Sequence, residues 1–127
     1  MEIKIERRKH KRYAPKLQSF AALRPEFKSV GRIKDISKGG LAFEYLAQDD
    51  GKNEPPRSEI DLFTSKGDFY IEKIPCRIIY DNEIKQYKGP LPKISRRKRC
   101  AVQFSDLPKK KSVLLEFFLN NYVLLSQ

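Results

Sequence analysis

Short runs of alternating apolar and polar residues cover most of the chain and predict β-strands. These runs lie at residues 17–24, 27–37, 41–46, 59–64, 68–81 and 99–104. Pro25 separates the first two runs, and Gly39 and Gly40 predict a turn before the third, because glycine adopts positive φ without steric cost. Pro75 predicts an edge, a bend or a bulge within the long fifth run, since proline cannot donate a hydrogen bond to a neighbouring strand.

The last part of the chain follows a helical pattern instead. Asp106 is a possible helix cap and Pro108 suits a first-turn position, so we expect a helix over about residues 108–125. One stripe of this helix is polar and consists of Lys109, Ser112, Glu116 and Asn120. The apolar surface around it is wider than packing on one neighbour requires. Packing against the strands explains that surface, and so does a homodimer formed through the helix.

Six strands followed by one helix predict a mainly β fold, namely a small antiparallel barrel with a C-terminal α-helix. The length of 127 residues suits one domain. We expect residues 1–16, which show no sustained periodicity, to form a flexible basic arm, and residues 17–127 to form the barrel domain. The polar stretches at 47–57 and 82–96 predict a surface loop and an exposed insertion, and the basic character of the insertion extends to residue 99.

Charge narrows the classes of partner. The chain has 27 Lys and Arg against 16 Asp and Glu, a net charge of +11, which favours nucleic acid, a nucleotide or an acidic membrane face as partner. No apolar stretch reaches the ~20 residues of a membrane span. Two distant cysteines, Cys76 and Cys100, are expected to be core residues of a cytoplasmic protein rather than a disulfide framework. With His10 as the sole histidine, no metal or cofactor is expected.

The amino-terminal cations include two arginines, Arg8 and Arg12, spaced four residues apart. An arginine fork can grip a phosphate or the O6 and N7 acceptors of guanine. Asp35 and Ser37, two residues apart, would share one face of a strand and could meet the N–H donors on the opposite edge of guanine. A duplex hides that edge, whereas a free guanine nucleotide exposes it. Taken alone, the segment is better explained as a turn in which Asp35 or Ser37 satisfies nearby backbone amides.

Together these two segments resemble the signature of the PilZ domain family. "RRKHKR" at 7–12 is similar to the RxxxR motif and "DISKGG" at 35–40 to the [D/N]xSxxG motif, in the same order. The resemblance implies a six-stranded barrel that binds cyclic di-GMP, a bacterial second messenger. It implies that Arg8 and Arg12 grip phosphates and guanine, with support from Arg7, that Asp35 and Ser37 meet a guanine edge, and that Gly40 holds the turn. Ala101 departs from a frequent family pattern, which has glycine there.

We therefore expect a non-enzymatic receptor in which cyclic di-GMP orders the basic arm and thereby signals to a partner protein. The sequence leaves two alternatives open. A small nucleic-acid-binding barrel would explain the net charge, and a ligand-free scaffold of the same fold would act through its last helix alone. Catalysis is not expected, because the chain has no nucleophile motif, and no carboxylate is evident that would orient His10.

Overall fold

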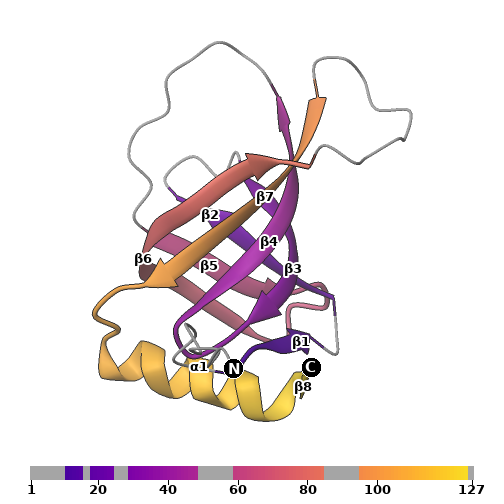
Figure 1. Ribbon diagram of the computed structural model, residues 1–127. Helices are drawn as coiled ribbons and strands as arrows, with labels where there is room; N and C mark the ends of the chain where they lie inside the picture. The colour runs from indigo at the N-terminus through magenta and orange to yellow at the C-terminus, as the bar shows by residue number, and fades with distance from the viewer. Residues whose placement is uncertain (1–10, 16–17, 25–28, 49–58, 85–94, 126–127) are drawn as a thin grey trace, which may run out of the picture.

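The computed structural model describes residues 11–15, 18–24, 29–48, 59–84 and 95–125. Along the chain the elements are β1 (Tyr13–Pro15), β2 (Ser19–Leu23), β3 (Val30–Ile36), β4 (Gly40–Gln48), β5 (Glu59–Thr64), β6 (Tyr70–Glu83), β7 (Ser95–Phe104), α1 (Lys109–Asn121) and β8 (Val123–Leu125). All strand pairs are antiparallel. Figure 1 shows the strands wrapped into a barrel with α1 lying across one end.

Six strands form the closed barrel. They are hydrogen-bonded in the order β2-β5-β6-β7-β4-β3, and β3 returns to β2 through pairs such as Phe20 with Arg32. Closure leaves these six strands without a free edge. The predicted fold class, a mainly β six-stranded barrel with a C-terminal helix, is therefore confirmed. The predicted strand at 59–64 agrees with β5 to the residue.

The core lies between the barrel wall and α1. Phe43 points into the barrel and Phe118 packs under it from the helix, and neither side chain has any exposed surface. Cys76 and Cys100 are both buried in the core, as expected. Burial, and to a lesser degree the negative charge of Glu59, raise the pKa of the Cys76 thiol to about 12.

Several predicted boundaries are corrected. The helix ends at Asn121 rather than near 125, because Val123–Leu125 pairs with β1 as a strand. No side chain caps its first turn, so the expected Asp106 cap is wrong. The strand β1 itself lies at the end of the predicted arm, where the sequence shows no periodicity. The proposed insertion at 82–99 is strand at both ends, where Glu83 pairs with Lys98, and its residues 85–94 lie outside the described part.

A buried carboxylate holds a bulge in the barrel wall. Asp61 on β5 has no exposed surface, and the register shift there places both Glu72 and Lys73 of β6 opposite it. Asp61 accepts hydrogen bonds from Arg24 at 2.7 and 3.0 Å, from the backbone N–H of Lys73 at 2.9 Å, and from the hydroxyl of Tyr70. Lys73 has a φ of 52°, a conformation that this backbone bond helps to hold.

These contacts shift the ionisation of the whole network. Burial alone would raise the pKa of Asp61, but the hydrogen bonds from Arg24, Lys73 and Tyr70 outweigh it and hold the pKa below its ordinary value. The same carboxylate raises the pKa of Arg24 and that of Tyr70, in each case chiefly by accepting a hydrogen bond. Asp61 therefore stays ionised at neutral pH although it is buried.

Candidate functional site

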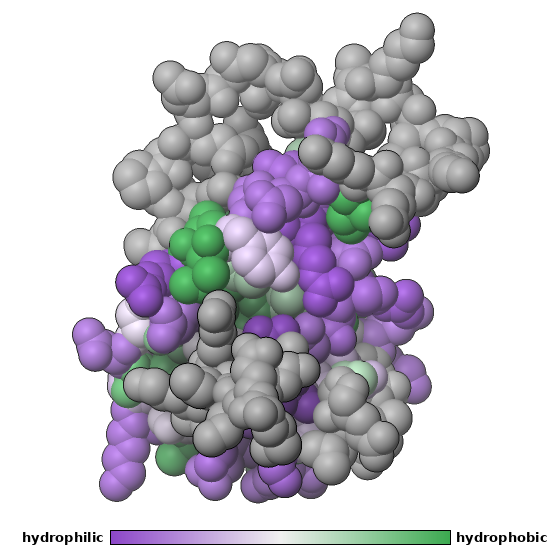
Figure 2. Space-filling model, in the orientation of Figure 1, coloured by the Kyte–Doolittle hydropathy of each residue, from purple (hydrophilic) through white to green (hydrophobic). Residues whose placement is uncertain are grey.

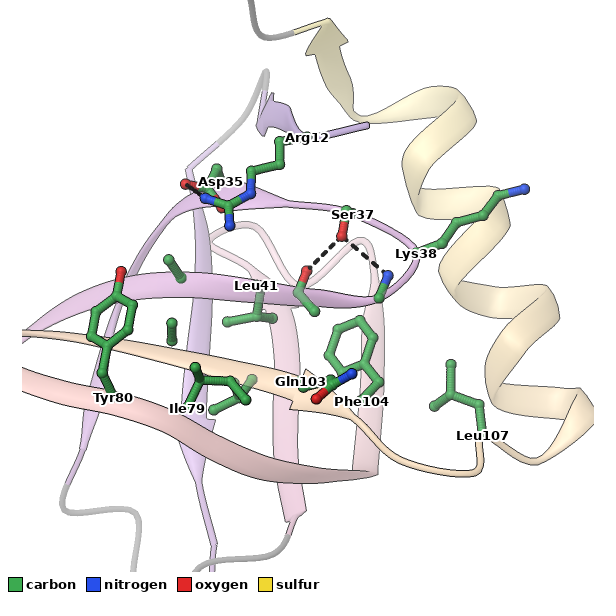
Figure 3. A pocket seen from close by; sticks show the side chains of 15 residues that line it. Arg12, Asp35, Ser37, Lys38, Leu41, Ile79, Tyr80, Gln103, Phe104 and Leu107 are labelled. Atoms are coloured by element: carbon green, nitrogen blue, oxygen red, sulfur yellow. Dashed lines mark hydrogen bonds and ion pairs between the residues drawn. The ribbon is translucent and has the colours of Figure 1, made fainter. Parts of the chain in front are cut away.

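A pocket of about 620 Å³ opens on the outer side of the barrel, close to the start of α1. Its volume lies within the range of small-molecule sites. It is lined by Arg12, Asp35, Ser37, Lys38, Gly39, Gly40, Leu41, Ala42, Ile79, Tyr80, Ala101, Val102, Gln103, Phe104 and Leu107. Figure 3 shows the turn between β3 and β4 on one side of the pocket, with Ile79 and Tyr80 of β6 across from it.

The turn is built by Ser37 and the two glycines that follow Lys38. The Ser37 hydroxyl accepts a hydrogen bond from the Gly39 N–H at 3.1 Å and donates one to the Gly40 carbonyl at 3.4 Å. The Ser37 N–H donates to the same carbonyl at 2.8 Å. The expectation of a turn in which Ser37 satisfies the backbone is confirmed. A Cβ on Gly40 would lie 2.1 Å from the Val102 carbonyl oxygen, so no side chain fits there.

Asp35 reaches the pocket because β3 contains a bulge. Ile33 pairs with Phe43 and Asp35 with Ala42, so Lys34 is an extra residue between them. In a strand of strict alternation Ile33 and Asp35 would share one face. The bulge separates them: Ile33 is buried at 3% exposure, yet the carboxylate two residues later lies on the outer surface of the barrel. A one-residue insertion of this kind turns all later side chains to the opposite face.

Two arginines flank the Asp35 carboxylate. Arg12 Nη1 lies 3.6 Å from Asp35 Oδ2, and Arg99 Nη2 donates a hydrogen bond to the same oxygen at 3.2 Å. Arg12 comes directly before β1, whose Tyr13 pairs with Ile36 and so fixes the arginine beside β3 (Figure 3). Arg99 was not among the predicted site residues. Its signal was the spacing of β7, where Arg99 and Ala101 fall on the same face.

The opposite wall of the pocket is apolar and also bulged. β6 shifts register against β7 between Ile78 and Tyr80, which leaves Ile79 54% exposed at the pocket. Tyr80 is 37% exposed and pairs with Ala101, whose methyl group lies on the pocket wall. The pocket thus joins cations and a carboxylate on one side to an aromatic ring and an aliphatic side chain on the other. Such a surface suits a flat polar ring that carries phosphate.

The structure brings together four of the six predicted site residues. Arg12, Asp35, Ser37 and Gly40 all line the pocket, whereas Arg7 and Arg8 lie outside the described residues. No group of three His, Cys, Asp or Glu side chains within the described ranges could hold a metal ion. Among these same ranges, no helix has the length and apolar character needed to cross a membrane.

Comparisons with known proteins point to one family. The family model described as the PilZ domain matches residues 6–120. The solved PilZ domain of YcgR from Escherichia coli with c-di-GMP has a TM-score of 0.59 and 18% identity, and 87% of each chain is covered. The crystal structure of YcgR from the same organism in complex with c-di-GMP has a TM-score of 0.57 and 17% identity, covering 91% of this chain and 46% of that one. A search of curated protein sequences finds no match.

Proposed function

Because the chain belongs to the PilZ domain family, whose model spans residues 6–120, we propose that it is a receptor for cyclic di-GMP. One observation carries the proposal: the Arg12 guanidinium and the Asp35 carboxylate lie 3.6 Å apart on the rim of one pocket. A guanine nucleotide needs both groups, a cation for phosphate and an acceptor for the N–H donors of the base. The two solved neighbours were each determined with c-di-GMP, which supports the same ligand here.

Each wall of the pocket suits a different part of this ligand. Arg12 would grip a phosphate through two parallel N–H bonds. Asp35 would accept from the N1–H and the exocyclic amine of guanine, and would leave its arginine partners to the phosphates. The Tyr80 ring and the Ile79 side chain would cover the flat face of a base. The methyl group of Ala101 narrows this wall by comparison with a glycine.

The arm would complete the site. Arg7 and Arg8 precede Arg12 by five and four positions, and we propose that they contact phosphate and guanine once ligand is bound. In this proposal Ser37 and Gly40 keep the turn open to the ligand, and the ordered arm changes the surface that a partner protein meets. The charge of the arm, with a net charge of +11 for the whole chain, would also speed capture of the anion.

Titration calorimetry with cyclic di-GMP, GTP, GMP and cyclic di-AMP tests this function. Cyclic di-GMP should bind best, and Asp35→Ala should weaken it by about tenfold or more, since a charge-assisted hydrogen bond contributes ~1.5–3 kcal/mol. Selectivity over cyclic di-AMP should also fall, because adenine presents an acceptor where guanine presents N1–H. Asp68→Ala, which removes an exposed carboxylate from the turn after β5, is the matched control.

Two results would contradict the proposal. Equal affinity for cyclic di-GMP and cyclic di-AMP would show that no group reads guanine. Tight oligonucleotide binding whose log affinity falls steeply with log salt, together with no cyclic dinucleotide binding, would favour a nucleic-acid-binding module instead.

The outward face of α1 supports contact with a second copy of the chain. Val113, Leu114 and Phe117 are 56%, 40% and 51% exposed on this face. An antiparallel copy would cover them, and would bring Lys109 and Lys110 close to the partner helix's carboxyl-terminal carbonyls, where positive charge is favourable. Val113→Glu should therefore abolish self-association in sedimentation equilibrium, while Ser112→Glu should not. Wild-type protein that stays monomeric at its solubility limit would contradict this contact.

A further inference from the structure

Five charged side chains form an alternating row across the outer face of β3, β4 and β7. Asp35 lies between Arg12, at 3.6 Å, and Arg99, at 3.2 Å. Glu44 in turn lies 3.5 Å from Arg99 and accepts a hydrogen bond from Arg97 at 2.8 Å. Each carboxylate is thus shared by two arginines. The row leads from the pocket described above to another part of the barrel surface.

The far end of the row borders a second hollow of about 400 Å³. It is lined by Val30, Arg32, Lys34, Glu44, Tyr45, Leu46 and Arg97. Arg32 and Lys34 form no ion pair within the described part of the chain, although Glu44 lies opposite Arg32 where β3 pairs with β4. Val30 and Leu46 are 41% and 54% exposed. In Figure 2 the visible face of the barrel carries hydrophilic residues with apolar patches on either side.

We propose that this hollow binds an acidic, amphipathic segment of a partner protein. Carboxylates of the segment would pair with Arg32 and Lys34, and its aliphatic side chains would cover Val30 and Leu46. A peptide also brings backbone N–H groups, from which the Glu44 carboxylate can accept hydrogen bonds.

Other occupants fit the hollow less well. Single-stranded nucleic acid is held by aromatic rings on which bases stack. The one aromatic residue in the lining, Tyr45, is 6% exposed and donates its hydroxyl hydrogen to Asp81 at 2.7 Å, and Glu44 would repel a phosphate. A second copy of the chain, related by a two-fold axis at the hollow, would place its own Arg32 and Lys34 opposite those of the first copy, and the like charges would repel.

The row predicts how the two sites influence each other, and this part rests on the proposed function. Cyclic di-GMP would engage Arg12 and draw Arg99 towards its phosphates. Glu44 would then lose one of its two arginines and pair more fully with Arg97, which lines the hollow. The phosphates would also add negative charge to the face that the acidic segment approaches. Both effects lower the affinity of the hollow for the segment, so binding of cyclic di-GMP should release the partner. The partner should in turn lower the affinity for cyclic di-GMP by the same factor.

A labelled synthetic peptide made only of glutamate and leucine, measured by fluorescence anisotropy, tests the hollow itself. Arg32→Glu should lower the affinity for this peptide by about tenfold, because it places a negative charge opposite the glutamates of the peptide. Lys66→Glu, in the exposed turn after β5, makes the same change in net charge and should leave the affinity within about twofold. An equal loss in both variants would mean that the peptide follows net charge, and would overturn the site. An oligonucleotide that binds more tightly and depends on Arg32 would overturn the assignment to a peptide.

The coupling has its own readout. Saturating cyclic di-GMP should lower the affinity for the peptide several-fold in wild type. The decrease should be smaller in Glu44→Gln, in which the row of charges is interrupted. Peptide binding that ignores cyclic di-GMP, in protein that calorimetry shows to bind it, would overturn the coupling and leave the hollow standing. Since the peptide assay without nucleotide needs no ligand in the first pocket, failure of the proposed function and failure of this inference give different results.

Discussion

Asp61→Ala should lower the free energy of unfolding by about 3 kcal/mol and Tm by on the order of 10 °C. The substitution leaves the Arg24 guanidinium, the Lys73 N–H and the Tyr70 hydroxyl without their shared acceptor. Removal of one partner from a buried ion pair costs about 3–5 kcal/mol in general. The lower end applies here because the Arg24 side chain is 23% exposed and can turn to water. Urea unfolding followed by circular dichroism gives the measurement.

Glu72→Gln is the matched control for this prediction. Glu72 also lies near Arg24, at 3.7 Å, but its side chain is 58% exposed, so the loss should stay under about 1 kcal/mol. Similar losses in the two variants would show that burial of Asp61 contributes nothing. An unchanged unfolding slope m in Asp61→Ala is required as well, since a change in m would indicate an altered unfolded state.

The lowered pKa of Asp61 fixes the sign of the pH dependence. A carboxyl whose pKa is lower in the folded state than its ordinary value of about 4 contributes stability above that value. The contribution is lost as pH falls through the folded pKa. The raised pKa of Tyr70 acts at the other end, where its contribution is lost as pH rises through the folded value. Asp61→Asn should therefore flatten the acid limb of a Tm-against-pH profile, and an acid limb as steep as in wild type would exclude Asp61 as its source.

Arg12→Ala should lower the affinity for cyclic di-GMP by about tenfold to a hundredfold, which corresponds to the loss of a charge-assisted hydrogen bond that contributes ~1.5–3 kcal/mol. Arg12 is the described residue that links the arm to the pocket, and its side chain is 41% exposed, so its removal should not unfold the barrel. Arg12→Lys keeps the charge but loses the planar fork, and should give an intermediate affinity. Calorimetry at physiological salt measures all three proteins.

Lys11→Ala separates a local contact from an effect of net charge. Lys11 is the neighbouring exposed cation, and its loss changes the charge of the arm by the same amount. Its affinity for cyclic di-GMP should stay close to that of wild type. If Arg12→Ala and Lys11→Ala lowered the affinity for cyclic di-GMP equally, the arm would attract the ligand only through its net charge, and Arg12 would make no specific contact in the site.

Local pattern was sufficient for the barrel and insufficient at the two ends of the chain. The run at 59–64 alternates and is bounded by polar residues, so its limits follow from sequence alone. β1 has three residues, too few for any periodicity. Val123–Leu125 continues the apolar pattern of α1, and it becomes a strand only because Tyr13–Pro15 lies beside it. A pairing across more than a hundred positions leaves no trace in either segment.

The site shows the same division between local and distant information. Arg12, Asp35, Ser37 and Gly40 belong to two short motifs, and the structure places them around one pocket. The arginine that reaches Asp35 from β7 belongs to no motif. The spacing of β7 places Arg99 on the same face as Ala101, but only the register of β4 against β7 brings it beside Glu44 and Asp35. The bulge at Lys34 was readable as a break in alternation, but its effect on the direction of Asp35 was not.

The three-residue ladder between β1 and β8 has a mechanical consequence. Tyr13 faces Leu125 at the end of the ladder from which both chain termini leave. Tension applied to the two termini would load these hydrogen bonds one after another, as a zipper opens, and not all together as in shear. The ladder would yield at low force, and the pull would then reach Arg12, the residue before β1, and draw it from Asp35. A stretched molecule would therefore release the proposed nucleotide ligand while the six strands of the barrel remain paired.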